Sequence, residues 1–482
     1  MSVARVLARN TGVQLVGRIL STILGVFMVG VMTRYLGQEG FGVYSTANAY
    51  LQIFALVLDL GINVTFVAML GEHADDPAYE KRCTSALFTL RLVMAFVVLG
   101  IAPFIWLALY PHETTFFWSI LALNGAFFCP SLLQIVTGVQ QRHFKMWISA
   151  LGEVSSRALL LGLLLLVRYL NLGLVPMILC VTLGSVASLL INLALMRESK
   201  LFRWNWDVPF WKDTIKRSWP IGVSIAFNLV YFKADMLILS RVRSLTETGV
   251  YGAAYRVLEI LITVPFMYAG VLLPILARTW AKRDHARLSF LISRSIEAML
   301  FLVCPMIVGM YFLGPRIMGI VAGSAFVVSG EVLKILVLAV AMIYVNTIVS
   351  HAIVALQIQR KMLPIYFAVA VLSLTGYLLL IPRYGMWAAA WITVFSEACV
   401  TLGALAMTHA HAPIHLRLRT VLATVAASLF MGWAIFELRS TMILIPILAG
   451  ALVYVIALLT LGGISKEEIQ DIVAVRKETE VL

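Results

Sequence analysis

The chain has 482 residues, of which 61% are hydrophobic and only 13% are charged, and its mean hydropathy is +0.95. A soluble domain is about a quarter charged and under half apolar, so this composition excludes an ordinary soluble protein and makes lipid the solvent for most of the chain. The net charge of +13 requires no nucleic-acid partner, because basic residues beside membrane spans and their attraction to anionic lipid account for it.

The apolar segments are long, uninterrupted and free of two-residue alternation, which favours helices over a closed barrel. The first ten residues, MSVARVLARN, lead directly into a full-length span, so we expect no cleavable signal peptide. The predicted fold class is an all-α polytopic membrane protein with about fourteen transmembrane helices. The expected spans are 11–33, 43–69, 84–110, 115–137, 147–168, 173–196, 217–240, 249–276, 292–314, 332–355, 362–381, 385–408, 418–437 and 442–463.

One phrase occurs twice in the chain, at the start of two spans. GVYSTA (42–47) opens the second span and GVYGAA (249–254) opens the eighth, and a looser echo, YGMWAAAWIT (384–393), opens the twelfth. Small residues at helix starts are common where helices pack closely, which is one explanation. A match separated by six spans favours a duplicated bundle, the plan of many transporters, with a substrate site where the repeats meet.

The duplication predicts two six-helix lobes followed by a C-terminal helix pair. We expect an N-lobe over 1–196, a linker over 197–216, a C-lobe over 217–408, and the last two spans with a tail over 409–482. The linker mixes bases with Trp and Phe, which is typical of a helix on the cytoplasmic surface. Most Lys and Arg residues fall on one side if both termini are cytoplasmic, and this bias predicts that orientation.

Several stretches carry a family resemblance. GRILSTILGVFMVGVMTRYLGQEGFGVYS (17–45) and DLGINVTF (59–66) resemble the opening of the polysaccharide-transport, Wzx-like flippases, which share the MOP superfamily with MurJ-type lipid II flippases and MATE drug exporters. Residues 232–257, 271–278 and 384–397 are similar to the same pattern. The resemblance covers nearly the whole chain, and it implies two six-helix lobes with alternating access to a central cavity.

The resemblance also implies a function. It points to a flippase that moves an undecaprenyl-diphosphate-linked oligosaccharide across the bacterial cytoplasmic (inner) membrane, for O-antigen or exopolysaccharide biosynthesis. The expected partners are this polyprenyl-diphosphate-linked glycan, membrane lipid, and assembly proteins such as a polymerase. One alternative is a MATE-like multidrug/ion antiporter, although cationic drugs prefer an acidic cavity. Another is a membrane glycan polymerase or ligase, which usually needs a larger extramembrane loop than this chain offers.

Four cations inside predicted spans are the candidate substrate-binding residues: Arg18, Arg91, Lys233 and Arg256. An ionisable group within a span costs about 2.5–3.5 kcal/mol on insertion scales, so each needs a partner or a function. The planar fork of Arg binds phosphate oxygens in pairs and keeps its proton, so these cations suit a diphosphate in a shared cavity. The resemblance places Arg18 and Arg256 where lipid II flippases also carry arginines.

A structural explanation competes with this one. Glu153 and Arg157 are spaced i, i+4, and Arg256 and Glu259 are spaced i, i+3, so either pair can neutralise itself on one helix face. Arg91 can instead extend its side chain to the inner interface.

Four carboxylates in the spans are candidates for ion coupling: Asp59, Asp235, Glu259 and Glu397. A buried carboxyl group can switch its charge and so carry a coupling H⁺ or Na⁺, although each of these is equally able to partner a nearby base. We expect no other cofactor and no metal site, because the five cysteines are scattered and the histidines lie mostly at loops. No GxxxxGK[ST] phosphate loop occurs, so no ATP hydrolysis of that kind is expected.

Overall fold

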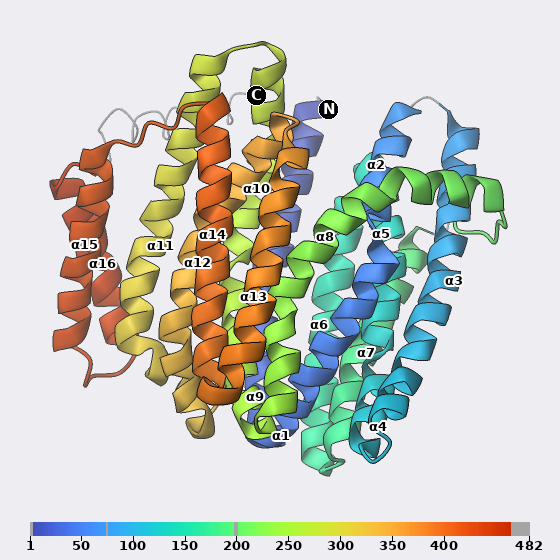
Figure 1. Cartoon of the computed structure of the whole chain (residues 1–482), viewed down its shortest axis with the longest axis horizontal. Coiled ribbons are helices and arrows are strands. Elements are labelled where there is room, and N and C mark those ends of the chain that lie inside the picture. The colour runs from blue at the N-terminus through green and yellow to red at the C-terminus, as the bar shows by residue number, and fades with distance from the viewer. Residues whose placement is uncertain (1–2, 74–75, 197–200, 464–482) are drawn as a thin grey trace. The chain divides into compact units, whose positions relative to one another are not determined.

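The structure is a computed structural model that describes residues 3–73, 76–196 and 201–463, and its regular secondary structure there is entirely helical (Figure 1). The chain divides into two compact units, Met1–Gly249 and Val250–Leu482. Of the predicted segments, residues 197–200 of the linker and 464–482 of the tail lie outside the described residues.

The first unit is built from eight helices and the start of a ninth. Their bounds are α1 (Val3–Asp59), α2 (Ile62–Glu72), α3 (Pro77–Leu109), α4 (Thr114–Leu123), α5 (Gly125–Arg142), α6 (Met146–Leu170), α7 (Leu174–Leu195), α8 (Val208–Val242) and α9 (Leu245–Leu261). Helix α1 is two helices joined at Gly37, whose φ of 64° and ψ of −173° break the helical path. Only glycine adopts this backbone conformation readily, so the break falls between the first two predicted spans.

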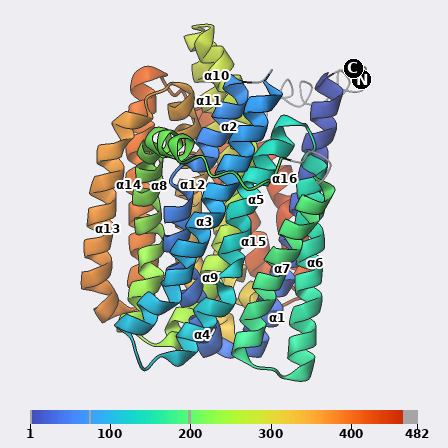
Figure 2. The same cartoon turned by 90° about the vertical axis from the view of Figure 1, so that its right-hand side faces the viewer.

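Close contacts through small residues hold α1 against α6 in this unit. The position of a Cβ on Gly17 lies 2.9 Å from the Cβ of Ala150, and one on Gly25 would lie 3.0 Å from Nη1 of Arg157. Helices α6 and α7 also lie side by side, as Figure 2 shows. In a bilayer, where lipid is as apolar as the side chains, such close packing is a main source of helix association.

The second unit contains the remaining helices. They are the rest of α9, then α10 (Thr263–Ala281), α11 (His285–Val321), α12 (Val327–Ala355), α13 (Leu363–Tyr384), α14 (Met386–His411), α15 (Leu418–Glu437) and α16 (Leu444–Thr460). Helix α12 packs against α10, α11 and α14 and is the most enclosed of the long apolar helices.

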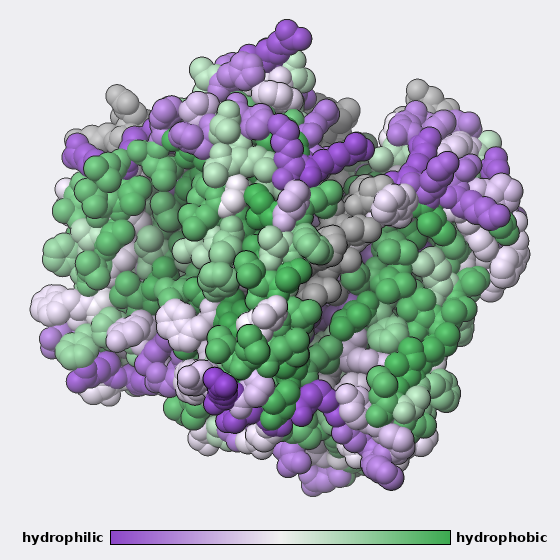
Figure 3. Space-filling view, in the orientation of Figure 1, coloured by the Kyte–Doolittle hydropathy of each residue, from purple (hydrophilic) through white to green (hydrophobic). Residues whose placement is uncertain are grey.

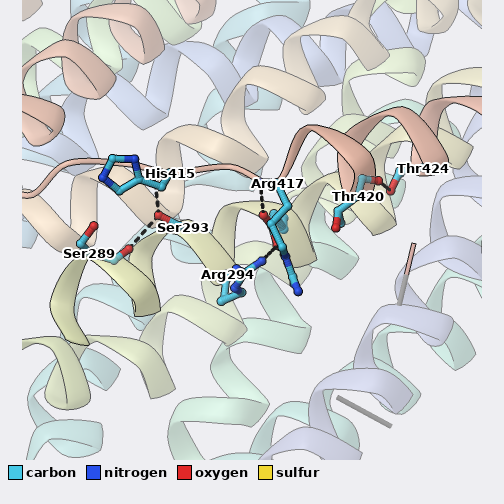
Figure 4. Close-up of polar contacts among 8 residues, drawn as sticks. Ser289, Ser293, Arg294, His415, Arg417, Thr420 and Thr424 are labelled. Carbon is cyan, nitrogen blue, oxygen red and sulfur yellow. Dashed lines mark hydrogen bonds and ion pairs between the residues drawn. The ribbon is translucent and has the colours of Figure 1, made fainter. Parts of the chain in front are cut away.

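The segment that leads into α15 is hydrogen-bonded to α11 at two residues, Ser293 and Glu297. Glu297 of α11 has only 1% of its side chain exposed, and it accepts hydrogen bonds from the backbone N–H of Arg417 (2.7 Å) and from that residue's guanidinium (3.0 Å). Figure 4 shows Arg294 and Arg417 converging there, while the backbone of His415 donates to Ser293 (3.0 Å). This buried carboxylate therefore ties the α14–α15 connection to α11.

Eleven helical segments of the described residues are long and apolar enough to cross a membrane, by length and composition. Hydrophobic side chains cover the middle of the visible helices and hydrophilic ones gather at their ends (Figure 3). The prediction of an all-α polytopic membrane fold is confirmed. The number fourteen is not confirmed: Gly12–Glu72 counts as one segment although it covers two predicted spans, and α8 and the shorter α16 fall outside the eleven. The predicted lobe boundaries stay predictions.

Candidate functional site

Arg18 lies in a three-residue ionic cluster with Glu153 and Arg157 of α6. Its Nη1 is 3.2 Å from Oε1 of Glu153, and Nη2 of Arg157 is 3.4 Å from the same oxygen. The side chains are 47%, 32% and 33% exposed, respectively. Two guanidinium groups thus share one carboxylate oxygen, so the cluster carries one positive charge that no other ion pair of the described residues compensates. We call these three residues the arginine triad.

Arg91 lies in a different environment, fully enclosed in the first unit. Its side chain is 1% exposed, and its Nη2 donates to Oδ1 of Asp59 at 2.6 Å. Its Nε and Nη1 are buried without a hydrogen-bond partner. Because Arg91 is buried, its side chain does not extend to the membrane interface. Its ion pair joins one predicted substrate-binding cation to one predicted coupling carboxylate.

Lys233 and Asp235, both on α8, are also buried in the first unit. Lys233 is 7% exposed and Asp235 is 1% exposed. The Oδ1 of Asp235 accepts a hydrogen bond from the backbone N–H of Met236 at 2.7 Å. Because both side chains are enclosed in this conformation, a ligand would need a rearrangement of α8 to reach them.

Arg256 belongs to the second unit and forms the predicted pair with Glu259. Its Nη1 is 2.7 Å from Oε2 of Glu259, and the two side chains are 24% and 26% exposed. The i, i+3 pairing that the spacing allowed is therefore present.

Glu397 on α14 is a buried coupling candidate for which the described residues show no ion pair. The residue is 3% exposed, and no Lys or Arg side chain of the described residues lies within 4.0 Å of its carboxylate. The hydroxyl of Thr401, one turn later on the same helix, donates to the backbone carbonyl of Glu397 (2.6 Å). Without a cation, a buried carboxyl group is more stable protonated.

A further ionic contact, which sequence reasoning missed, joins α8 to the α3–α4 loop. Both nitrogens Nη1 and Nη2 of Arg241 lie 2.8 Å from the two carboxylate oxygens of Glu113. The guanidinium also lies over the rings of Tyr110, Trp106 and Phe116, with its Cζ 4.0, 4.4 and 5.5 Å from their centroids. The hydrogen bonds from Arg241 lower the pKa of Glu113 below its ordinary value. We call this arrangement the α8 clamp.

The repeated phrase brings two glycines together in the first unit. A Cβ on Gly42 would collide with the carbonyl of Leu245, and a Cβ on Gly249 would collide with the carbonyl of Gln38. The Cβ positions are also 3.2 Å and 3.0 Å from the backbone nitrogen of the other glycine. Gly42 therefore faces the carbonyl of Leu245, and Gly249 faces the carbonyl of Gln38. Any side chain at either glycine would push these two backbone segments apart.

These clusters differ in what they can do chemically. The arginine triad combines exposed guanidinium groups, a surplus positive charge and a position in membrane-crossing helices. Arg binds phosphate oxygens in pairs, so the triad suits a phosphate or diphosphate group. The pair of Arg91 and Asp59 is balanced and enclosed, which is typical of a structural ion pair. No group of three or more His, Cys, Asp or Glu side chains in the described part of the chain is placed to hold a metal ion.

Comparison with known proteins identifies the family. Residues 7–280, more than half of the chain, match the family described as "Polysaccharide biosynthesis protein". A Shigella dysenteriae protein provisionally named an O-antigen transporter is 25% identical over 385 residues, which cover 77% of this chain and 92% of that protein. A Haloferax volcanii protein provisionally named flippase AglR is 21% identical over 97% of this chain and 98% of its own length.

The fold has solved counterparts. The structure titled "Lipid II flippase MurJ, inward closed conformation" aligns with a TM-score of 0.77 and 15% identity, over 92% of this chain and 97% of that one. At this identity the likeness shows the fold alone. The predicted resemblance is confirmed, as is the prediction of a transporter instead of an enzyme. By its sequence match over the first 280 residues and its all-helical fold, the chain belongs to the polysaccharide biosynthesis protein family of multi-pass membrane transporters.

Proposed function

We propose that this transporter is a flippase for a glycan linked through a diphosphate to a polyprenyl lipid. It would carry the headgroup from the inner to the outer leaflet of a bacterial cytoplasmic membrane, with both termini on the cytoplasmic side, by alternating access. The family and the relatives named above support transport in polysaccharide biosynthesis. The polymerase and other assembly proteins remain predicted partners.

The observation that carries the proposal is the arginine triad. Two arginines on membrane-crossing helices would each need a counter-ion, yet Glu153 is the one carboxylate that they share. A diphosphate supplies the missing negative charge and several acceptor oxygens. Hydrogen bonds to charged groups contribute about 1.5–3 kcal/mol each, enough for the ligand to compete with Glu153 for both guanidinium groups.

Glu153 would give the site a way to release its ligand. In the absence of the headgroup, the carboxylate holds Arg18 and Arg157 in place across the α1–α6 contact. When the headgroup leaves, the carboxylate takes its place again, so the two guanidinium groups are never left unpaired. The glycan would remain hydrated and the polyprenyl tail would stay in the lipid. No covalent bond changes in this cycle.

For energy coupling we propose a proton on Glu397. Asp59 and Glu259 are held in ion pairs, and Asp235 accepts a backbone hydrogen bond. Glu397 is enclosed without a cation among the described residues, so protonation stabilises it in this conformation. Hydration of the site in another conformation would favour the charged form and release the proton.

The test replaces arginines in a host that lacks its own copy of the protein. Accumulation of lipid-linked glycan in the inner leaflet should be relieved by the wild type and not by Arg18→Ala/Arg157→Ala. The matched control is Arg168→Ala, which removes an exposed arginine from the last turn of the same helix, α6, and should leave transport unchanged. Membrane levels of each variant separate loss of transport from loss of protein.

Two more variants sharpen the result. Glu153→Gln should strengthen headgroup binding and slow its release, because the competing charge is gone. Glu397→Gln should abolish the dependence of transport on the pH gradient. Full transport by Arg18→Ala/Arg157→Ala would refute the diphosphate site, and normal glycan export with changed drug sensitivity would instead favour a MATE-like exporter.

A further inference from the structure

The segment between α7 and the bilayer-crossing part of α8 carries an unusual surface. Residues 201–206 have no regular secondary structure, and Asp207 then caps α8 by accepting from the backbone N–H of Phe210 (3.2 Å). The first turns of α8 run across the ends of neighbouring helices before α8 turns to run along them (Figures 1 and 2). These first turns contact α2 and α3.

The inner face of this segment is fixed to α3. The indole N–H of Trp211 donates to the carbonyl of Ala86 (2.9 Å), and Nε of Arg82 lies 2.7 Å from Oδ2 of Asp207. Thr214, one turn after Trp211, is completely buried. The orientation of the segment is therefore set by its own unit, and the opposite face of the same helix must point outward.

The outer face combines exposed indoles with exposed cations. Trp204, Trp206 and Trp219 are 70%, 64% and 54% exposed, and the rings of the first two stack with centroids 6.4 Å apart. Basic side chains without an ion pair among the described residues outnumber the acidic ones on this stretch: exposed Arg203, Lys212 and Lys216 against exposed Asp213. We call residues 203–219 the Trp–Lys surface.

Indole rings favour the headgroup level of a bilayer, where an apolar body and a polar N–H are both accommodated. Basic side chains beside them attract anionic lipid, at about 1 kcal/mol for each Lys or Arg. A soluble phosphate would use the cations but would not need three exposed indoles. Both kinds of residue are explained at once by a lipid with an acidic headgroup.

From these residues we propose that the Trp–Lys surface, residues 203–219, binds the headgroups of anionic phospholipids. The indoles lie among the headgroups, and Lys212 and Lys216, one turn apart, pair with the lipid phosphates. The proposal is independent of which molecule the protein transports.

The test is a binding titration of the full-length protein in detergent, with short-chain phosphatidylglycerol, short-chain phosphatidylcholine and inorganic pyrophosphate as separate probes. Wild-type protein should bind the anionic lipid at least tenfold more tightly than the zwitterionic one. Lys212→Gln/Lys216→Gln should lose about fivefold in affinity for each cation removed. The control Lys282→Gln/Arg287→Gln removes the same charge from exposed positions around the α10–α11 turn and should keep wild-type affinity.

A second measurement follows the indoles directly. Phospholipids brominated near the headgroup should quench the wild-type tryptophan fluorescence more than that of Trp204→Phe/Trp206→Phe. Equal affinity for the two lipids, or equal losses in the lysine variant and its control, would overturn the proposal. Competition by pyrophosphate as strong as by phosphatidylglycerol would also overturn it, in favour of a soluble phosphate site. None of these results depends on transport, so the proposed function can fail independently.

Discussion

Replacing Gly249 with alanine should destabilise the protein through the close approach of Gly249 to Gln38 and Gly42 in the first unit. The added methyl would collide with the carbonyl oxygen of Gln38 and lie 2.8 Å from its carbonyl carbon and 3.0 Å from the backbone nitrogen of Gly42. All three are backbone atoms, so no side chain can rotate away and the helices must separate. Overpacking of this kind costs about 1–3 kcal/mol.

Thermal unfolding of the purified protein measures this cost. With an unfolding entropy of about 2.1 cal/mol/K per residue, a chain of this length loses roughly 1 °C in Tm for each kcal/mol. The Gly249→Ala variant should therefore melt about 1–3 °C lower than the wild type. The matched control is Gly162→Ala in α6, where a methyl would meet nothing within 4 Å, and alanine there should leave Tm unchanged or raise it.

The double variant Gly42→Ala/Gly249→Ala tests whether the two glycines share one contact. Once the first methyl has separated the two backbone segments, the second methyl meets less steric clash. The decrease in Tm of the double variant should therefore be smaller than the sum of the decreases of the two single variants. Strict additivity would mean that the glycines act at separate contacts. Identical melting of Gly249→Ala and Gly162→Ala would refute the close approach altogether.

Two further predictions concern ion pairs. Glu113→Gln should lower Tm at neutral pH, and a double-mutant cycle with Arg241→Gln should give a coupling of about 1–2 kcal/mol. Because Arg241 lowers the pKa of Glu113, this stabilisation is present above the ordinary carboxyl range and is lost as the pH falls through the lowered pKa. Wild type and Glu113→Gln should therefore converge once the pH is below that lowered pKa. Asp59→Asn, which leaves the buried Arg91 unpaired, should cost about 3–5 kcal/mol, and Asp59→Asn/Arg91→Met should cost less. Equal loss in the single and double variants would show that Asp59 stabilises the fold by other means.

The sequence predicted best what depends on local spacing. The pairs Glu153–Arg157 and Arg256–Glu259 follow from helical periodicity alone, and both are present. The helical fold follows equally from composition, because lipid leaves the backbone few ways to satisfy its polar groups.

Contacts between distant segments could not be predicted in this way. Arg91 meets Asp59, Arg18 meets Glu153, and the α8 clamp joins Arg241 to Glu113 across 128 positions. Each such pair depends on how helices are arranged in space, about which a single sequence has no information. The aromatic residues Trp106, Tyr110 and Phe116 lie close to Glu113 in the sequence. This clustering indicates a binding place for an arginine, since guanidinium groups frequently lie over aromatic rings.

The repeated phrase joins the two kinds of information. Spacing alone left open whether GVYSTA and GVYGAA were chance or duplication, and the duplication stays a prediction. In the first unit the two glycines do meet, and each faces the carbonyl four residues before the other. The side chains that follow agree: Val43 and Tyr44 are buried, as are Val250 and Tyr251. In both copies, therefore, the glycine permits a close backbone approach and the next two residues are buried.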